Sequence, residues 1–291
     1  MSKLTYFLFI LLAFTSCKDP EVAPQTAVSL TPEQEQLLLG NPSGATTAVS
    51  NENNYLIQKP QYVLSYSRER ATPNWVSWHV SRDWLGTAPR QNNFRADPAL
   101  PEGWYHVTTS SYTGSGFDRG HNTPSADRTN TEEDNAATFL MTNIIPQAPN
   151  NNQETWANLE DYTRELVQQG MEVYVLMGSY GVGGTGDKGY ATTIDNGKIT
   201  VPKRIWKVLV VLPEGENDLQ RITTATRVIA VDTPNSNTVK PDWGMYRTTV
   251  DAIEQATGYD LLSAVPAKVQ QALESHQDNG PTHQALTHPI L

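Results

Sequence analysis

The sequence contains only one cysteine, Cys17, among its 291 residues. No disulfide can therefore form within one chain, and stability has to come from packing of the apolar residues, whose 38% share is enough for a core. Basic residues are also scarce, since 21 Lys and Arg face 31 Asp and Glu and give a formal net charge of −10. This balance argues against a general polyanion-binding surface, so any phosphate site has to be local.

Long apolar runs are missing as well. The run from Leu4 to Phe14 is shorter than the about 20 residues of a transmembrane helix, and with Lys3 before it and small residues after it, residues 1–16 have the pattern of a secretion signal. Ala13-Phe14-Thr15-Ser16-Cys17 resembles a lipobox. We therefore expect an exported protein that is anchored to a membrane through a lipidated Cys17 and faces the periplasm or the cell exterior. The alternative is an unpaired cysteine in an ordinary cleavable signal.

The segments at the two ends of the mature chain are polar. Residues 17–54 are rich in Pro, Thr, Ser, Asn, Gln and Glu, and we expect a flexible tether there. One short helix is plausible within it, because Thr31 and Pro32 form a capping pattern ahead of three leucines. Residues 277–291 are expected to be a loose polar tail.

Residues 55–276 are predicted to form one folded domain. Residues 62–66 and 75–81 alternate in polarity with period two, which predicts paired antiparallel strands, and His79 on the second is expected to be a half-buried sheet residue. Together with the remaining elements, they predict an α+β fold with a central antiparallel sheet flanked by helices. Further strands are expected at 171–177, 199–201, 205–212 and 227–231, and helices at 152–169, 249–257 and 267–275.

A glycine-rich stretch, Gly181-Val-Gly-Gly-Thr-Gly186-Asp187-Lys188, superficially suggests a phosphate-binding loop. A Walker loop requires Lys directly after the second glycine, then Ser or Thr, then a helix. Here Asp187 intervenes and the following residues resemble a β-strand, so a hairpin is the better prediction.

The most demanding chemistry lies in Phe117-Asp118-Arg119-Gly120-His121. An arginine can hold two phosphate oxygens while a neutral imidazole nearby takes a proton from water. Asparagines 150–152 are expected to cap the helix that follows, on which Asn152, Glu160 and Arg164 can face one side at about 100° per residue. From the helix alone, Glu160 and Arg164 could equally form a weak i, i+4 surface ion pair.

Several motifs together resemble the DNA/RNA non-specific endonuclease family, which has a ββα-metal or His-Me finger active site. The resemblance runs from about residue 60 to 275. It rests on Phe117-Asp118-Arg119-Gly120-His121, Asn143-Ile-Ile-Pro-Gln147 and Asn152-Gln-Glu-Thr-Trp156-Ala-Asn-Leu159-Glu160, supported by Asn93-Phe94-Arg95-Ala-Asp97-Pro98, Trp206-Lys207-Val208 and Thr249-Val250-Asp251-Ala-Ile253-Glu254.

The resemblance implies a role for each matching residue. His121 would be the general base, Asn152 the direct ligand of Mg²⁺ or Mn²⁺, and Glu160 the residue that holds metal-bound water. Asp118 would orient its neighbours rather than bind the metal. The residues implied in binding the substrate phosphate and its surroundings are Arg119, Arg164 and Asn143, with Arg90 as a further arginine by spacing and Arg95 as its nearby competitor.

These roles imply a magnesium-dependent endonuclease that cuts both DNA and RNA and leaves 5′-phosphate and 3′-hydroxyl ends. With His121 near the unperturbed pKa of about 6.5, activity would fall below that pH. One alternative is a non-catalytic surface lipoprotein that binds an anionic polymer or a protein partner. Another is a phosphodiesterase or phosphatase with a narrower substrate.

Overall fold

The computed structural model describes residues 30–282, and its main element is a seven-stranded sheet in which every neighbouring pair is antiparallel. The predicted strands 62–66 and 75–81 are confirmed as β2 and β3, which pair with Val63 opposite Ser77. In spatial order the strands are β1 (Tyr55–Lys59), β2 (Tyr62–Ser67), β3 (Thr72–Val80), β6 (Met171–Tyr180), β11 (Arg204–Pro213), β12 (Arg227–Pro234) and β13 (Arg247–Thr248).

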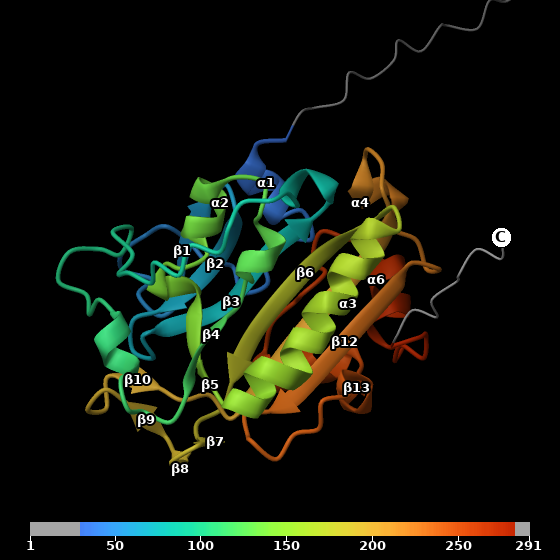
Figure 1. Cartoon of the computed structure of the whole chain (residues 1–291). Coiled ribbons are helices and arrows are strands. Elements are labelled where there is room, and N and C mark those ends of the chain that lie inside the picture. The colour runs from blue at the N-terminus through green and yellow to red at the C-terminus, as the bar shows by residue number, and fades with distance from the viewer. Residues whose placement is uncertain (1–29, 283–291) are drawn as a thin grey trace, which may run out of the picture.

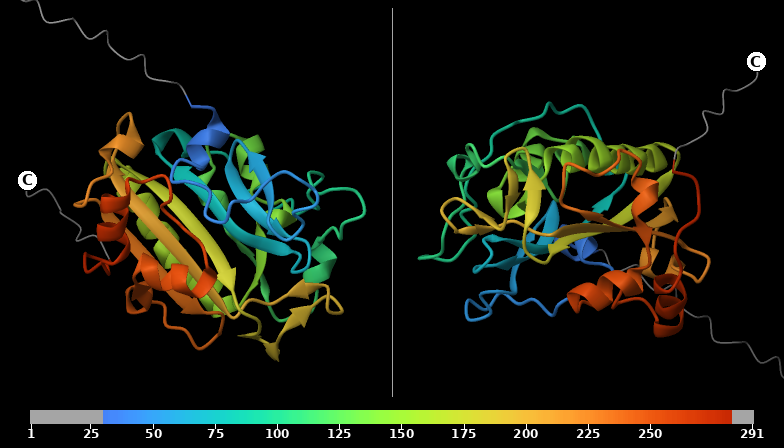
Figure 2. Two further views of the ribbon diagram at one scale, coloured as in Figure 1. Left: turned by 180° about the vertical axis from the view of Figure 1, so that it is seen from behind. Right: turned by 90° about the horizontal axis from the view of Figure 1, so that it is seen from below.

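Apolar layers cover both faces of this sheet, as the predicted α+β architecture requires. The long helix α3 (Ala157–Gln168) crosses one face and packs Leu159 against a layer that includes Trp78. The other face is covered by the C-terminal helices α5 (Val250–Thr257) and α6 (Ala267–Glu274), which contribute Ile253 and Leu273 to a second layer. The right-hand view in Figure 2 shows α3 and the C-terminal helices on opposite sides of the sheet.

Sequence signals located the ends of α5 well. Thr249 caps α5 by accepting a hydrogen bond from the backbone nitrogen of Ala252 at 3.1 Å, and Gly258 ends it in the left-handed region with φ +75°. The shorter helices are α1 (Pro32–Gln36), α2 (Glu132–Ala137) and α4 (Asp218–Arg221).

Three small antiparallel pairs lie beside the main sheet in Figure 1. One of them is the hairpin predicted for the glycine-rich stretch, with Asp187 and Lys188 at its turn. The pairs are β4 (Asp118–His121) with β5 (Ile144–Gln147), β7 (Gly184–Gly186) with β8 (Gly189–Ala191), and β9 (Thr193–Ile194) with β10 (Ile199–Thr200).

The expected tether is wrong for residues 31–54, because this segment packs against the sheet. Gln36 is fully buried, and its amide oxygen accepts a hydrogen bond from the backbone nitrogen of His79 at 2.7 Å. Leu39 is also buried, and the indole nitrogen of Trp75 donates to Ser43 Oγ at 2.8 Å. The polar composition suggested a solvated segment, but its few apolar side chains and its amides find partners on β3.

The expected loose tail is likewise wrong for residues 277–282. Asp278 is buried and forms ion pairs with Arg227 Nε at 2.8 Å and Arg247 Nη1 at 3.2 Å, which tie the end of the domain to β12 and β13. The predicted signal, Cys17 and residues 283–291 lie outside the described residues. Between residues 30 and 282, no helix is long and apolar enough to cross a membrane.

Candidate active site

The site is built on a ββα unit in which the antiparallel pair of β4 and β5 precedes the segment that leads into α3. In this pair, Arg119 lies opposite Pro146 and His121 lies opposite Ile144. Gly120 lies between them, and a Cβ at this position would come within 2.6 Å of Gln147 Cβ. Only glycine therefore allows the two strands to approach closely enough to place Arg119 and His121 as they are.

The helix of this unit does not start with the predicted asparagine cap. Residues Asn151–Trp156 form one π-helical segment ahead of α3, and Asn150 caps nothing with its side chain. The asparagines instead bind β12 and the residues after it, since Asn150 Nδ2 donates to the carbonyl of Asn237 and Asn151 Nδ2 donates to Thr233 Oγ1, both at 2.8 Å. These tertiary bonds replace the cap, and such π segments are frequent at functional sites.

Asp118 controls the orientation of Asn152. Its Oδ2 accepts hydrogen bonds from Asn152 Nδ2 and from Gln153 Nε2, each at 2.8 Å. The amide nitrogen of Asn152 is thereby fixed on Asp118, while its amide oxygen has no hydrogen-bond donor among residues 30–282. A free amide oxygen is a suitable ligand for a hard cation such as Mg²⁺.

A cavity of about 180 Å³ brings together residues that are far apart in the sequence. It is lined by five of the predicted residues and by one further segment of the loop after β4. The lining residues are Arg90, Arg119, His121, Asn152 and Glu160, together with Pro124, Ser125 and Ala126.

His121 lies in aromatic surroundings, with the Phe94 and Phe139 rings at centroid distances of 5.3 and 5.0 Å. Its Nε2 is buried and has no hydrogen-bond partner among the described residues. Burial, and then the guanidinium groups of Arg90 and Arg119, lower the pKa of His121 to about 3. The expected pKa near 6.5 is therefore wrong for the site as it stands, and the imidazole is neutral well below pH 6.

Two arginines of the cavity are held by aromatic rings. The guanidinium of Arg119 lies 4.2 Å from the centroid of Phe94, and that of Arg90 lies 4.9 Å from the centroid of Phe139. Arg90 also donates to Ser125 Oγ. Arg95 does not line the cavity, because its Nη1 donates to the carbonyl of Ala136 at 2.7 Å. Of the two competing arginines, the structure thus places Arg90 at the site.

Glu160 is held by the buried Lys207, which belongs to the Trp206-Lys207-Val208 motif and has no role in the predicted site. Lys207 Nζ lies 3.3 Å from Glu160 Oε1 and between the Trp78 and Trp156 rings, 5.6 and 5.2 Å from their centroids. Burial raises the pKa of Glu160, and the charges of Lys207 and then Arg164 oppose that rise. Apart from Arg204 at its first position, Lys207 is the only charged residue of β11, and this charge inside an apolar run was the signal available in the sequence.

Besides Asp118, which acts on Asn152, two of the predicted residues do not line the cavity. Arg164 Nη1 pairs with Asp127 Oδ1 at 2.8 Å and its Nη2 pairs with Asp161, so two carboxylates engage this guanidinium and it forms no ion pair with Glu160. Asn143 is fully buried, and its side chain accepts from the backbone nitrogen of Thr123 at 3.0 Å. Its position is that of a residue that shapes the loop after β4, not of one that touches a substrate.

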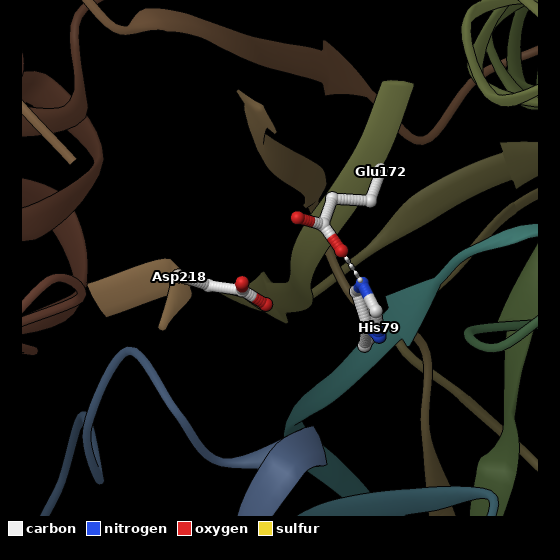
Figure 3. A group of neighbouring side chains, drawn as sticks. All are labelled: His79, Glu172 and Asp218. Carbon is white, nitrogen blue, oxygen red and sulfur yellow. Dashed lines mark hydrogen bonds and ion pairs between the residues drawn. The ribbon is translucent and has the colours of Figure 1, made fainter. Parts of the chain in front are cut away.

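The described residues also contain a His–Glu–Asp group able to hold a metal ion, formed by His79, Glu172 and Asp218, whose ligand atoms lie within 4.8 Å of one another (Figure 3). It lies on the sheet face opposite α3, where the His79 ring stacks on Tyr174 at 4.3 Å. Arg221 pairs with Glu172 and with Asp218. Because a cation already neutralises these carboxylates, the group is better suited to joining elements than to serving the cavity.

His79 is more buried than predicted and connects the N-terminal segment to the sheet. Its Nδ1 lies 2.7 Å from Glu35 Oε1 and its Nε2 lies 3.2 Å from Glu172 Oε2. Burial lowers the pKa of His79, but the hydrogen bonds with Glu172 and Glu35 outweigh it and leave the pKa raised.

A ββα unit with a neutral histidine, two arginines and a free amide oxygen around one cavity defines the class of ββα-metal nucleases, and comparison with known proteins agrees. The sequence profile of the DNA/RNA non-specific endonuclease family matches residues 40–268. The Nuclease of Nostoc sp. (strain PCC 7120 / SAG 25.82 / UTEX 2576) is 51% identical over 272 residues, which cover 94% of this chain and 96% of that protein. The Nuclease of Serratia marcescens is 28% identical over 267 residues, or 87% of this chain and 90% of that protein.

The fold agrees as well. The crystal structure of the EndoG/EndoGI complex contains a chain that superposes with a TM-score of 0.67 at 21% identity, covering 83% of this chain and 96% of that one. The present chain belongs to the DNA/RNA non-specific endonuclease family. It is a DNA/RNA endonuclease, and the resemblance to this family that the sequence motifs suggested is confirmed.

Proposed function

We propose that the chain is a magnesium-dependent, sugar-non-specific endonuclease that leaves 5′-phosphate and 3′-hydroxyl ends. The observation that supports this best is the convergence of Arg90, Arg119, His121, Asn152 and Glu160 on one cavity. The cavity contains a base, a cation-binding oxygen and phosphate-binding cations, which are the groups that phosphodiester hydrolysis requires.

The scissile phosphate would lie between Arg90 and Arg119. Neither guanidinium has an ion-pair partner among residues 30–282, so each has donors to offer to phosphate oxygens. His121, neutral and beside them, would take a proton from the water that attacks phosphorus, while the bond to the 3′ oxygen breaks. The 3′ oxygen leaves as an alkoxide and takes a proton from solvent water, which gives the 3′-hydroxyl end, and the imidazolium returns its proton to solvent.

The donor set fits a hard divalent cation. Asn152 would bind it through the amide oxygen that Asp118 leaves free, and Glu160 would hold its water molecules. When bound there, Mg²⁺ would offset the negative charge on the phosphate and assist the leaving oxygen, and Mn²⁺ suits the same oxygen ligands. Because Arg90 and Arg119 would contact the phosphate and not the base edges or the 2′-hydroxyl, they would serve DNA and RNA alike.

The proposal is tested with purified protein, plasmid, single-stranded DNA and RNA, with Mg²⁺, with Mn²⁺ and with EDTA. We expect all three polymers to be cut with metal only and to carry 5′-phosphate ends. His121→Ala should lower turnover at least about 100-fold, whereas the exposed control His276→Ala should not. Asn152→Ala should raise the Mg²⁺ concentration needed for half-maximal activity. Near-normal cleavage by the His121 variant, or activity in EDTA, would contradict the proposal, and cleavage of small phosphodiesters alone would favour the narrower phosphodiesterase.

We also propose that the protein is exported and attached to a membrane through a lipidated Cys17, as the lipobox-like segment suggests. Such a location would bring the enzyme to nucleic acids outside the cytoplasm. Labelling of expressing cells with radioactive palmitate should mark the wild-type protein and leave Cys17→Ala unmarked. Equal labelling of both would rule out this anchor.

A further inference from the structure

A second cavity, also of about 180 Å³, adjoins the first and shares Arg119 with it. It has room for about six water molecules at their share of liquid volume, which is more than a single phosphate contact needs. Its lining residues are Thr109, Tyr112, Thr113, Phe117, Asp118 and Arg119. The functional roles assigned above use only Asp118 and Arg119 of this set.

The wall of this cavity presents polar atoms that the protein does not use. Tyr112 is only 6% exposed, and its hydroxyl forms no hydrogen bond with any residue between 30 and 282. Asp118 commits Oδ2 to the amides of Asn152 and Gln153, while its Oδ1 accepts from no described donor. Neither atom is among the fully buried unpaired groups of the described residues, so both are accessible from the cavity and can bond with a ligand there.

The β7–β8 hairpin, the glycine-rich stretch that resembled a phosphate loop, fixes the wall. Gly116 O accepts from Asp187 N at 2.9 Å, and Lys188 Nζ donates to Gly114 O at 2.6 Å. A side chain at Gly186 would collide with the carbonyl of Gly116, so glycine is needed for this contact. The hairpin thus supports the backbone that follows Tyr112 and Thr113.

The same hairpin is tied to the segment that carries Asn152. Asn237 Nδ2 donates to Asp187 Oδ1 at 2.7 Å, and Asn237 accepts two hydrogen bonds from Asn150, one from its backbone nitrogen and one from its Nδ2. The same network of hydrogen bonds therefore fixes the wall of the second cavity and the segment that carries Asn152. A rigid connection of this kind can position one substrate in both cavities.

We propose that the second cavity binds the nucleoside attached to the scissile phosphate, while Arg119 holds the phosphate at the junction of the two cavities. This inference rests on the proposed function. A second phosphate would face the carboxylate of Asp118, whereas a neutral group with hydroxyls and amines can donate to Asp118 and bond with Tyr112. The Tyr112 and Phe117 rings add apolar surface against the sugar or base.

The test compares three 4-nitrophenyl phosphodiesters that differ in whether, and on which side of the phosphate, they carry a nucleoside. Thymidine 5′-(4-nitrophenyl phosphate) and thymidine 3′-(4-nitrophenyl phosphate) carry the nucleoside on opposite sides of the phosphate, and methyl 4-nitrophenyl phosphate has no nucleoside. Tyr112→Phe keeps the buried ring and removes only the hydroxyl, so we expect its KM for one of the thymidine esters to rise about three- to tenfold, as for one lost hydrogen bond. The kcat/KM for the methyl ester should stay within about twofold.

A second variant fills the cavity from an exposed position. Thr113→Trp should raise the KM for the same thymidine ester by about tenfold or more, because the indole would occupy the cavity and exclude the nucleoside. Thr113 is exposed, so this substitution removes no buried side chain. The control Tyr190→Phe alters a tyrosine that is 67% exposed and should change nothing. Equal loss on all three esters, or no loss on any, would overturn the nucleoside site. If the wild type hydrolyses none of the esters and no polymer, the proposed function itself fails.

Discussion

Replacing Lys207 by methionine tests whether the buried pair with Glu160 organises the site. Methionine fills a similar volume between Trp78 and Trp156 but leaves the Glu160 carboxylate without its closest cation. At 3.3 Å, with an effective dielectric constant of about 20, the attraction between the two charges is about 5 kcal/mol. Desolvation of a lysine that is 2% exposed offsets much of this gain in the intact pair.

Breaking one side of a buried pair typically costs about 3–5 kcal/mol. Because the Glu160 side chain is 18% exposed and Arg164 also stabilises its charge, we expect the lower end, about 3 kcal/mol, in chemical denaturation at pH 7. The loss of Lys207 should also raise the pKa of Glu160 further and increase the Mg²⁺ concentration needed for half-maximal activity.

A double-mutant cycle separates this pair from simple loss of packing. Adding Glu160→Gln to Lys207→Met removes the unpaired charge, so the double variant should be at least about 1 kcal/mol more stable than the sum of the single effects. Lys268→Met, at an exposed position on α6, serves as the control and should be close to neutral. Single effects that add within about 0.5 kcal/mol would refute a coupled pair.

Two further predictions concern residues away from the reacting groups. Glu172 and Glu35 raise the pKa of His79 in the folded state, so the contribution of His79 to the unfolding free energy is fully present below about pH 6.5 and is lost as pH rises through the folded pKa. In denaturation series, the stability difference between wild type and His79→Gln should therefore shrink as pH rises through that range. A difference that stays constant with pH would contradict this prediction. Gly120→Ala should push a Cβ against Gln147, cost about 1–3 kcal/mol in unfolding free energy and lower activity, and an unchanged melting temperature would show that the two strands can separate.

The sheet could be predicted from the sequence because local patterns determine it. Period-two alternation identified β2 and β3, the apolar runs identified β6 and β11, and Thr249 and Gly258 marked the ends of α5. These signals depend on residues that are neighbours in the chain.

The failures arose where distant contacts determine the structure. Gln36 is buried through bonds to β3, about forty residues away, so composition alone suggested a tether. The π-helical start of the α3 segment depends on bonds from asparagines 150 and 151 to residues after 230. Likewise, the lowered pKa of His121 comes first from burial and then from Arg90 and Arg119, and of these causes only Arg119 belongs to the local motif of that histidine.

The arrangement of charge explains how a chain with a net charge of −10 can act on a polyanion. Many arginines of the described part, such as Arg204 and Arg227, are neutralised by a carboxylate, but Arg90 and Arg119 are held by the faces of Phe139 and Phe94. An aromatic face fixes a guanidinium without cancelling its charge, and it leaves the donors on the guanidinium edge free. A carboxylate in the same place would compete with the substrate phosphate. The two phenylalanines therefore maintain a locally cationic cavity on an acidic protein, so that attraction to phosphate is concentrated where the bond is cut.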